Sequence, residues 1–90
     1  MGEPLTPRAV QKQLPPQWTL KDDEIVRTYD FESYLAGVEF AADVARIADE
    51  ALHHPRITIE FRSVTIVFTS HEAGGVTEQD LELAERVETL

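Results

Sequence analysis

Residues 31–52 are the part of the sequence that most restricts how this chain can fold. Apolar side chains recur there at steps of three and four residues, along two stripes on nearly opposite sides of a helix. One stripe contains Phe31, Leu35, Val38, Ala42, Ala45 and Leu52, and the other contains Phe40, Val44, Ile47 and Ala51. Because a helix that is apolar on two sides must be covered twice, we expect one side to pack on a sheet and the other on a helix or a neighbouring subunit. The contact between subunits is expected to involve Phe40, Val44 or Ile47.

The residues before this helix predict a short helix and a hairpin. Thr6 followed by Pro7 is typical of a helix start, because the threonine hydroxyl accepts a free backbone N–H and proline suits the first helical position. Pro15 must end this helix. Residues 18–20 and 24–29 flank a polar tripeptide, and we expect them to form two strands joined by a tight turn.

A second hairpin is expected after the long helix. Residues 56–61 and 64–69 alternate between apolar and polar side chains, as strands of a half-buried sheet do. We expect Arg62 and Ser63 to form a two-residue turn between them. The pairs in this register are Phe61 with Val64, Ile59 with Ile66, and Ile57 with Phe68. The apolar residues of the hairpin then share one face, which supports the register.

The end of the sequence predicts a third helix. Thr77 and Asp80 have the spacing of a capping box, and an apolar stripe follows them. The pair Gly74-Gly75 is expected to form a turn before this helix. The order helix, two strands, helix, two strands, helix lacks the regular alternation of parallel sheets. We therefore expect one α+β domain over residues 1–90, with an antiparallel sheet covered by helices.

The composition excludes several classes of function. Eight lysine and arginine residues against seventeen acidic ones give a net charge of −9, which repels nucleic acids and anionic lipid headgroups. There is no cysteine, and this excludes disulfides and thiolate chemistry. No apolar run exceeds three residues, which is too short for a membrane span. We expect a cytoplasmic protein with no nucleic-acid or membrane partner.

The three histidines of the chain are expected to meet at one place. In the register above, His54 and His71 are direct cross-strand neighbours, with Cβ atoms about 5 Å apart. His53 precedes His54 at the end of the long helix. Asp49 lies one helical turn before His53, and we expect a hydrogen bond from His53 to this carboxylate to orient the ring. Imidazoles titrate near neutral pH, so the cluster is a candidate for acid–base catalysis.

Other interpretations of these residues stay open. A single histidine at a helix end or on an exposed strand is as often a solvated surface group as a functional one. A three-histidine zinc site is a further alternative, although no carboxylate stands at a recognised ligand spacing. Asp80 is most simply a residue of a helix start. We expect no metal and no cofactor.

The second half of the chain resembles the pterin-4a-carbinolamine dehydratase family. Its pattern is an acidic residue four before His-His-Pro, an aromatic six after the proline, a histidine ten further on and an aspartate nine beyond. The residues that match it are Asp49-Glu50-Ala51-Leu52-His53-His54-Pro55, Phe61, Thr69-Ser70-His71-Glu72, Gly74-Gly75-Val76-Thr77 and Asp80. The resemblance implies a four-stranded antiparallel sheet with three helices, assembled as a homodimer or homotetramer.

The resemblance also implies an activity, the dehydration of 4a-hydroxytetrahydropterin to quinonoid dihydropterin. Carried over by position, His53 and His71 are the general acid–base pair, with Asp49 orienting His53. The pterin-binding residues would be His54, Pro55, Thr69, Ser70 and Asp80. Three positions depart from the pattern: Ile57 where tryptophan is common, Phe61 where tyrosine is common, and Arg56 where an acid is frequent. The same fold also serves as a non-catalytic module, in Rubisco assembly or transcription-factor dimerisation, and this is the alternative function.

Overall fold

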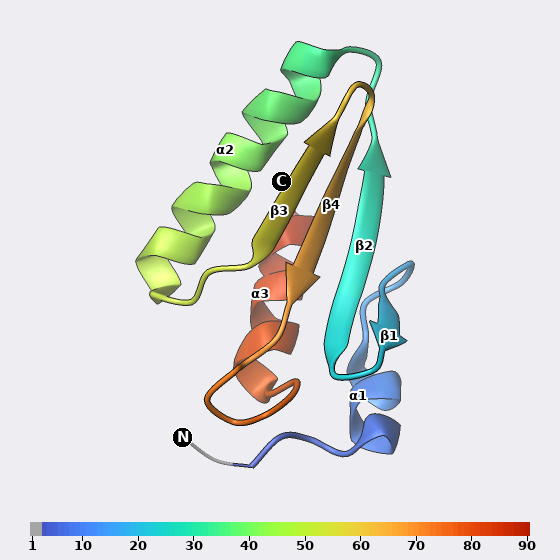
Figure 1. The fold of residues 1–90 in the computed structure, drawn as a ribbon, viewed down its shortest axis with the longest axis vertical. Coiled ribbons are helices and arrows are strands. Elements are labelled where there is room, and N and C mark those ends of the chain that lie inside the picture. Colours follow the sequence, from blue (N-terminus) through green and yellow to red (C-terminus); the bar gives the residue numbers. More distant parts are fainter. Residues whose placement is uncertain (1–2) are drawn as a thin grey trace.

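A computed structural model describes residues 3–90 and has the element order that the sequence predicts. Figure 1 shows a long helix beside a twisted antiparallel sheet, with a second helix crossing behind the sheet and a short one near its edge. The elements are α1 (Pro7–Gln13), β1 (Thr19–Lys21), β2 (Glu24–Asp30), α2 (Tyr34–Ala51), β3 (Arg56–Glu60), β4 (Ser63–Phe68) and α3 (Glu78–Glu88). The expected α+β fold with four strands and three helices is confirmed.

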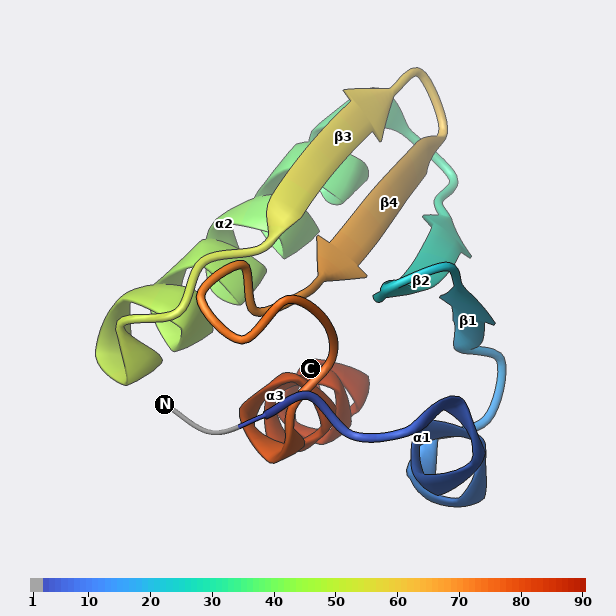
Figure 2. The same cartoon turned by 60° about the horizontal axis from the view of Figure 1, so that its bottom comes forward.

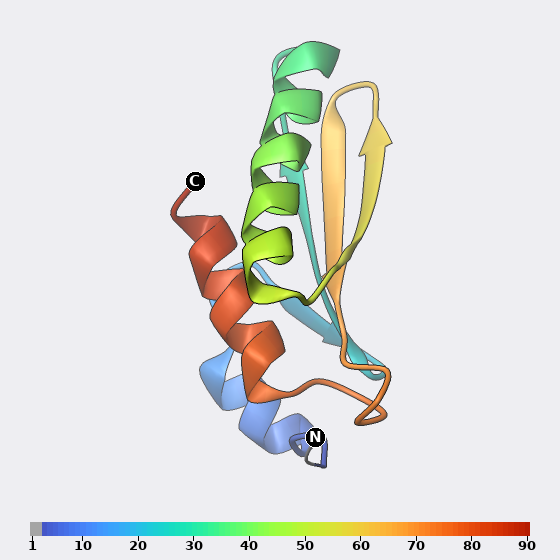
Figure 3. The same ribbon diagram turned by 90° about the vertical axis from the view of Figure 1, so that its left-hand side faces the viewer.

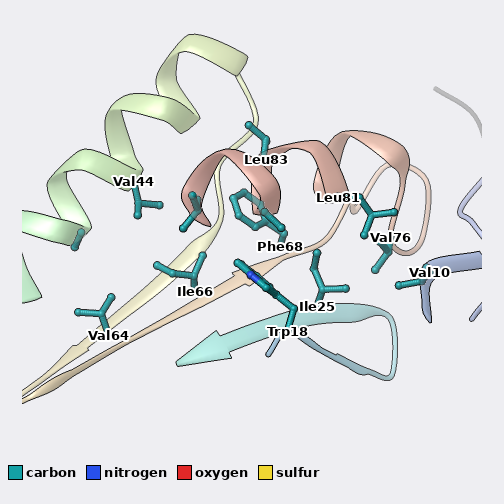
Figure 4. Packing of buried hydrophobic residues seen from close by; sticks show 13 residues of the cluster. Val10, Trp18, Ile25, Val44, Val64, Ile66, Phe68, Val76, Leu81 and Leu83 are labelled. Carbon is teal, nitrogen blue, oxygen red and sulfur yellow. The ribbon is translucent and has the colours of Figure 1, made fainter. Parts of the chain in front are cut away.

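The four strands form one antiparallel sheet in the order β1-β2-β4-β3. The helices lie together on one face of this sheet (Figure 3). Val64, Ile66 and Phe68 of the central strand β4 point toward the helices and are fully buried, because alternate residues of a strand share a face. Figure 4 shows them packed with Trp18 and with Leu81 and other residues of α3.

The helix starts follow the local signals in the sequence. Thr6 caps α1, with its hydroxyl accepting the Ala9 N–H at 3.1 Å. The long helix begins at Tyr34, three residues after the predicted start at Phe31, because Ser33 is its cap and accepts a backbone N–H. None of the helices in residues 3–90 combines the length and the hydropathy needed to cross a bilayer.

The predicted register of the second hairpin is wrong by two residues. Ile57 pairs with Ile66 and Ile59 with Val64, so the turn consists of Phe61 and Arg62. A shift of two leaves every side chain on its predicted face, which is why alternation alone did not detect it. Phe61 lies in the turn with 70% of its surface exposed, where it was expected to pair with Val64. The shift also removes the direct cross-strand pairing of His54 with His71.

Helix α2 buries one of its two apolar stripes. Val44 is fully buried, and Phe40 and Ile47 pack on the core of the same chain. Full burial rules Val44 out of the predicted subunit contact, whereas Phe40 and Ile47 are only partly buried and stay predicted contact residues. On this inner side, a Cβ atom at Gly37 would come within 3.1 Å of Val64, so glycine allows the helix to approach the sheet closely. The other stripe faces outward, with Leu35 63% exposed.

Candidate active site

The end of α2 and the loop between β4 and α3 meet at one end of the molecule (Figure 2). The loop folds back on itself, because Ser70 and Gly75 form an isolated β-bridge in which the Ser70 N–H donates to the Gly75 carbonyl at 3.0 Å. Gly74 has φ +84°, a left-handed conformation that glycine adopts without strain. The predicted turn at Gly74-Gly75 is confirmed, and it holds His71 at the surface of this end.

His53 and His54 follow directly after the end of α2 and point in different directions. Leu52 has φ 54° and ψ 40°, a left-handed conformation that ends the helix. The His53 N–H still donates to the Ala48 carbonyl, at 3.1 Å, which is typical of such helix ends. The His53 side chain turns inward and is 17% exposed, whereas that of His54 is 60% exposed.

A buried carboxylate holds His53 in place. The Oδ1 atom of Asp80 lies 2.6 Å from Nε2 of His53, and Asp80 has no exposed surface. Its other oxygen accepts the Ser70 hydroxyl at 2.7 Å and the Thr77 N–H at 2.8 Å. In the tautomer with a proton on Nε2, His53 donates this hydrogen bond to the carboxylate of Asp80. The ring also stacks on Phe68, nearly parallel at an interplanar angle of 7°.

The predicted hydrogen bond between Asp49 and His53 is wrong. Asp49 lies 2.9 Å from Nε2 of His54 instead. Residues four apart share a face only within a helix, and α2 ends before residue 53. The left-handed turn at Leu52 instead brings the side chain of His54 close to the Asp49 carboxylate. This pair is largely exposed, with 60% and 78% of the two side chains accessible, so it contributes little to stability.

The three histidines line one cavity of about 670 Å³. Its volume falls in the range typical of small-molecule sites. Two of the predicted binding residues, Thr69 and Ser70, also line it, whereas Pro55 does not. Asp80 is not on the cavity wall either; it lies buried behind His53, so its predicted direct contact with a ligand is corrected to a supporting role.

Sequence reasoning missed several residues of the cavity wall. The wall also contains Glu3, Leu5, Leu52, Glu72, Ala73, Thr77, Glu78 and Gln79. The N-terminal segment reaches the cavity because the Leu5 N–H donates to the Val76 carbonyl at 2.8 Å, a contact for which the sequence has no signal. Leu52 and Glu72 adjoin histidines in the sequence, and this adjacency was the available signal for them.

The donor arrangement does not support the three-histidine zinc alternative. Within residues 3–90, no group of three or more histidine, cysteine, aspartate or glutamate side chains is arranged to hold a metal ion. Instead, His53 is engaged by Asp80 and His54 by Asp49. The arrangement is suited to proton transfer, with one imidazole held by a carboxylate and two more on the same cavity.

The fold and the site together define a small α+β protein with a histidine-lined cavity. The family model for pterin 4 alpha carbinolamine dehydratase matches residues 3–90, and the chain belongs to this family. A protein of Natronomonas pharaonis, provisionally named a pterin-4-alpha-carbinolamine dehydratase, is 50% identical over 90 residues, covering 100% of this chain and 98% of its own. A similarly named protein of Halobacterium salinarum is 51% identical over 88 residues, covering 98% and 97%.

Two solved structures share the fold. One, described as a transcriptional coactivator/pterin dehydratase from Brucella melitensis, has a TM-score of 0.89 at 25% identity and covers 97% of each chain. The other is described as a pterin dehydratase-like protein that is a RuBisCO assembly factor in the alpha-carboxysome. It has a TM-score of 0.64 at 23% identity and covers 80% of this chain and 83% of its own, a likeness that concerns the fold alone.

Proposed function

We propose that this protein dehydrates 4a-hydroxytetrahydropterin to quinonoid dihydropterin and water. An acid donates a proton to the 4a-hydroxyl, and the bond between C4a and oxygen breaks as water leaves. A base removes the proton from N5, and the electrons of the N–H bond form the double bond between N5 and C4a. Both steps suit groups that titrate near neutral pH. Nothing is oxidised or reduced, and histidine acid–base chemistry requires no Lewis acid, so the proposal includes no cofactor and no metal.

His53 and His71 are proposed as the acid–base pair, and His54 as a residue that binds the pterin. The observation that carries this proposal is the hydrogen bond between His53 and buried Asp80, on a cavity that the other two histidines share. A fixed tautomer leaves one defined nitrogen for proton transfer, and a fixed ring keeps that nitrogen in position. Thr69 and Ser70 are proposed to bind the substrate alongside His54, as residues of the same wall.

We also propose that the protein works as a homodimer or homotetramer in the cytoplasm. A chain of this size buries only about 60% of its unfolded surface, so a further interface adds needed burial. The outward stripe of α2 and the β3–β4 hairpin offer apolar surface, with Leu35 63%, Phe61 70% and Ile59 38% exposed. Light scattering at micromolar concentration is expected to give a multiple of 10.2 kDa. A homogeneous monomer would contradict this.

A non-catalytic binding module on the same fold is the second candidate. The observation in its favour is the shared fold with a protein described as a RuBisCO assembly factor. Turnover separates the two candidates directly. A 4a-hydroxy adduct is generated freshly, and formation of quinonoid dihydropterin is followed with and without the protein. Acceleration proportional to protein concentration is the expected result, and a rate equal to the uncatalysed one would leave the binding module as the better explanation.

A further inference from the structure

Leu52 is an unusual residue for its position. It ends α2 with φ 54° and ψ 40°, a conformation in which a β-carbon is crowded and which glycine or asparagine adopts more easily. Leu52 is 84% exposed, more than any other large hydrophobic residue in the described chain. Backbone preference disfavours leucine here, and packing within the chain does not explain it. A strained backbone conformation that packing within the fold does not require indicates a functional role for the residue.

The place where Leu52 is exposed is the cavity wall. Leu52 lines the cavity next to His53 and His54, at the point where the chain leaves α2. The same wall carries three exposed carboxylates, Glu3, Glu72 and Glu78. The wall therefore combines an exposed apolar group with several carboxylates. A ligand that covered Leu52 would remove its apolar surface from water, and this would favour binding.

We propose that Leu52 determines substrate specificity by contacting an uncharged chain on C6 of the pterin. The inference rests on the proposed function, because it uses the position of the reacting atoms. N5 must lie within reach of a histidine for its proton to be removed. C6 is bonded to N5, so a chain on C6 leaves the ring beside that histidine. Leu52 adjoins two of the three histidines, and the carboxylates around it repel a chain that carries phosphate.

The test compares the binding of three stable pterins to the whole protein by fluorescence quenching. The first has no chain on C6, the second has a neutral dihydroxypropyl chain, and the third has a phosphorylated chain. Wild type is expected to bind the second about 5- to 10-fold more tightly than the other two. Leu52→Asn is expected to reduce the preference for the neutral chain over no chain to within about twofold. The same variant should raise the melting temperature by roughly 2 to 5 °C, since asparagine tolerates the left-handed backbone.

Gln17→Asn is the matched control. Gln17 also has a left-handed backbone, with φ 72°, and is exposed, but it does not line the cavity. Its substitution should raise the melting temperature in the same direction and leave all three affinities unchanged. Replacing both Glu72 and Glu78 by glutamine should raise the affinity for the phosphorylated pterin, and added salt should raise it in wild type.

The outcomes separate the inference from the function on which it rests. If wild type binds none of the three pterins, the proposed substrate class is wrong and the inference fails with it. If pterins bind and Leu52→Asn keeps the full preference for the neutral chain, the inference is wrong and the proposed function stands. A lower melting temperature or a smaller assembly mass for Leu52→Asn would assign Leu52 to the fold or to a subunit contact, and would also overturn the inference.

Discussion

The two ends of helix α3 carry carboxylates that differ in what they hold. Asp80, in the first turn, accepts hydrogen bonds from His53, Ser70 and Thr77 and reaches the candidate active site through His53. Glu88, in the last turn, accepts from side chains of a quite different kind. The Oε2 atom of Glu88 accepts hydrogen bonds from Nε1 of Trp18 at 2.9 Å, from Nη1 of Arg27 at 2.6 Å and from the hydroxyl of Tyr29. The first carboxylate organises a cavity, and the second ties the helix to β2 and the segment before β1.

The helix dipole explains why the two carboxylates need different partners. A negative charge is favoured near a helix N-terminus, so Asp80 is stable there with backbone and hydroxyl donors. Glu88 lies at the unfavourable end, where the guanidinium of Arg27 offsets the dipole. Asp80 therefore needs no arginine or lysine, and its one titratable donor is a histidine. The two carboxylates therefore differ in the charge of their partners: a guanidinium at Glu88, and an imidazole with neutral donors at Asp80.

The largest expected effect comes from removing the histidines themselves. His53→Ala and His71→Ala should each lower the dehydration rate by about 10²- to 10⁴-fold, the usual contribution of a general acid or base. His54→Ala should instead raise KM more than it lowers kcat, because its proposed contact exists in the ground state as well. Circular dichroism checks that each variant is folded. Wild-type rates in folded His53→Ala and His71→Ala would show that the catalytic assignment is wrong.

Asp80→Asn is expected to have the next largest effect and tests the active-site end of α3. An amide has one acceptor oxygen in place of two, so it cannot serve both His53 and the Thr77 N–H. We expect stability to fall by about 1 to 3 kcal/mol, the cost of leaving buried polar groups unpaired. Activity of the folded variant should fall by at least about tenfold, because His53 loses its orientation. If the folded variant kept full activity, Asp80 would serve only to cap helix α3 and would not be needed to orient His53.

The same change at the other end of the helix sharpens the comparison. Glu88→Gln should lower stability by about 1 to 2 kcal/mol in urea unfolding, since it removes the charge that binds Arg27 and Tyr29. Activity at a temperature where the variant is folded should stay within about twofold of wild type, because Glu88 does not line the cavity. A tenfold loss of activity would mean that the two ends are coupled and that the comparison fails.

The pH dependence of stability follows from the Glu88 cluster. Burial alone would raise the pKa of Glu88, but hydrogen bonds from Tyr29 and Trp18 and the charge of Arg27 outweigh it and lower the pKa. Burial, followed by the Glu88 contact, raises the pKa of Tyr29 above its ordinary value. A lowered carboxyl pKa stabilises the fold above the unfolded value and loses this effect as the pH falls through the folded value. Below about pH 4.3, wild type should therefore lose stability more steeply than Glu88→Gln.

The sequence predicted the elements well but left open two details that decide the site. Alternation has a period of two, so registers two residues apart place the same side chains on the same face. Ile59 opposite Ile66 and Ile59 opposite Val64 were equally consistent with a buried face. The pairing of His54 with His71 depended on the first register and failed with it. What survived was the meeting of the three histidines, because both hairpin ends lie at one end of the sheet.

The second detail was the end of helix α2. The predicted end at residue 52 lies within one residue of the observed end at Ala51. Leucine rarely takes a left-handed backbone, however, so nothing in the sequence indicated that the chain turns away from the helix axis at Leu52. Asp49 and His53 were therefore predicted to lie one helical turn apart on the same face. Asp80 was predicted most simply as a residue of a helix start. Asp80 is both a capping residue and the partner of His53, a double role that needs the tertiary contact between α3 and the loop after β4. The Glu88 cluster had no local signal, because its donors are about 60 to 70 residues away in the sequence.

Asp49→Asn is expected to have the smallest effect, although the sequence predicted it as the residue that orients the catalytic histidine. Its carboxylate faces His54, and 78% of the side chain is accessible, so the interaction is screened by water and salt. Stability should change by less than about 0.5 kcal/mol. Because His54 is proposed to bind the pterin, the change should appear in KM, by about two- to threefold, with kcat nearly constant. Measuring kcat and KM for Asp49→Asn beside Asp80→Asn decides which carboxylate supports His53: a large fall in kcat for Asp49→Asn alone would restore the predicted pairing of Asp49 with His53.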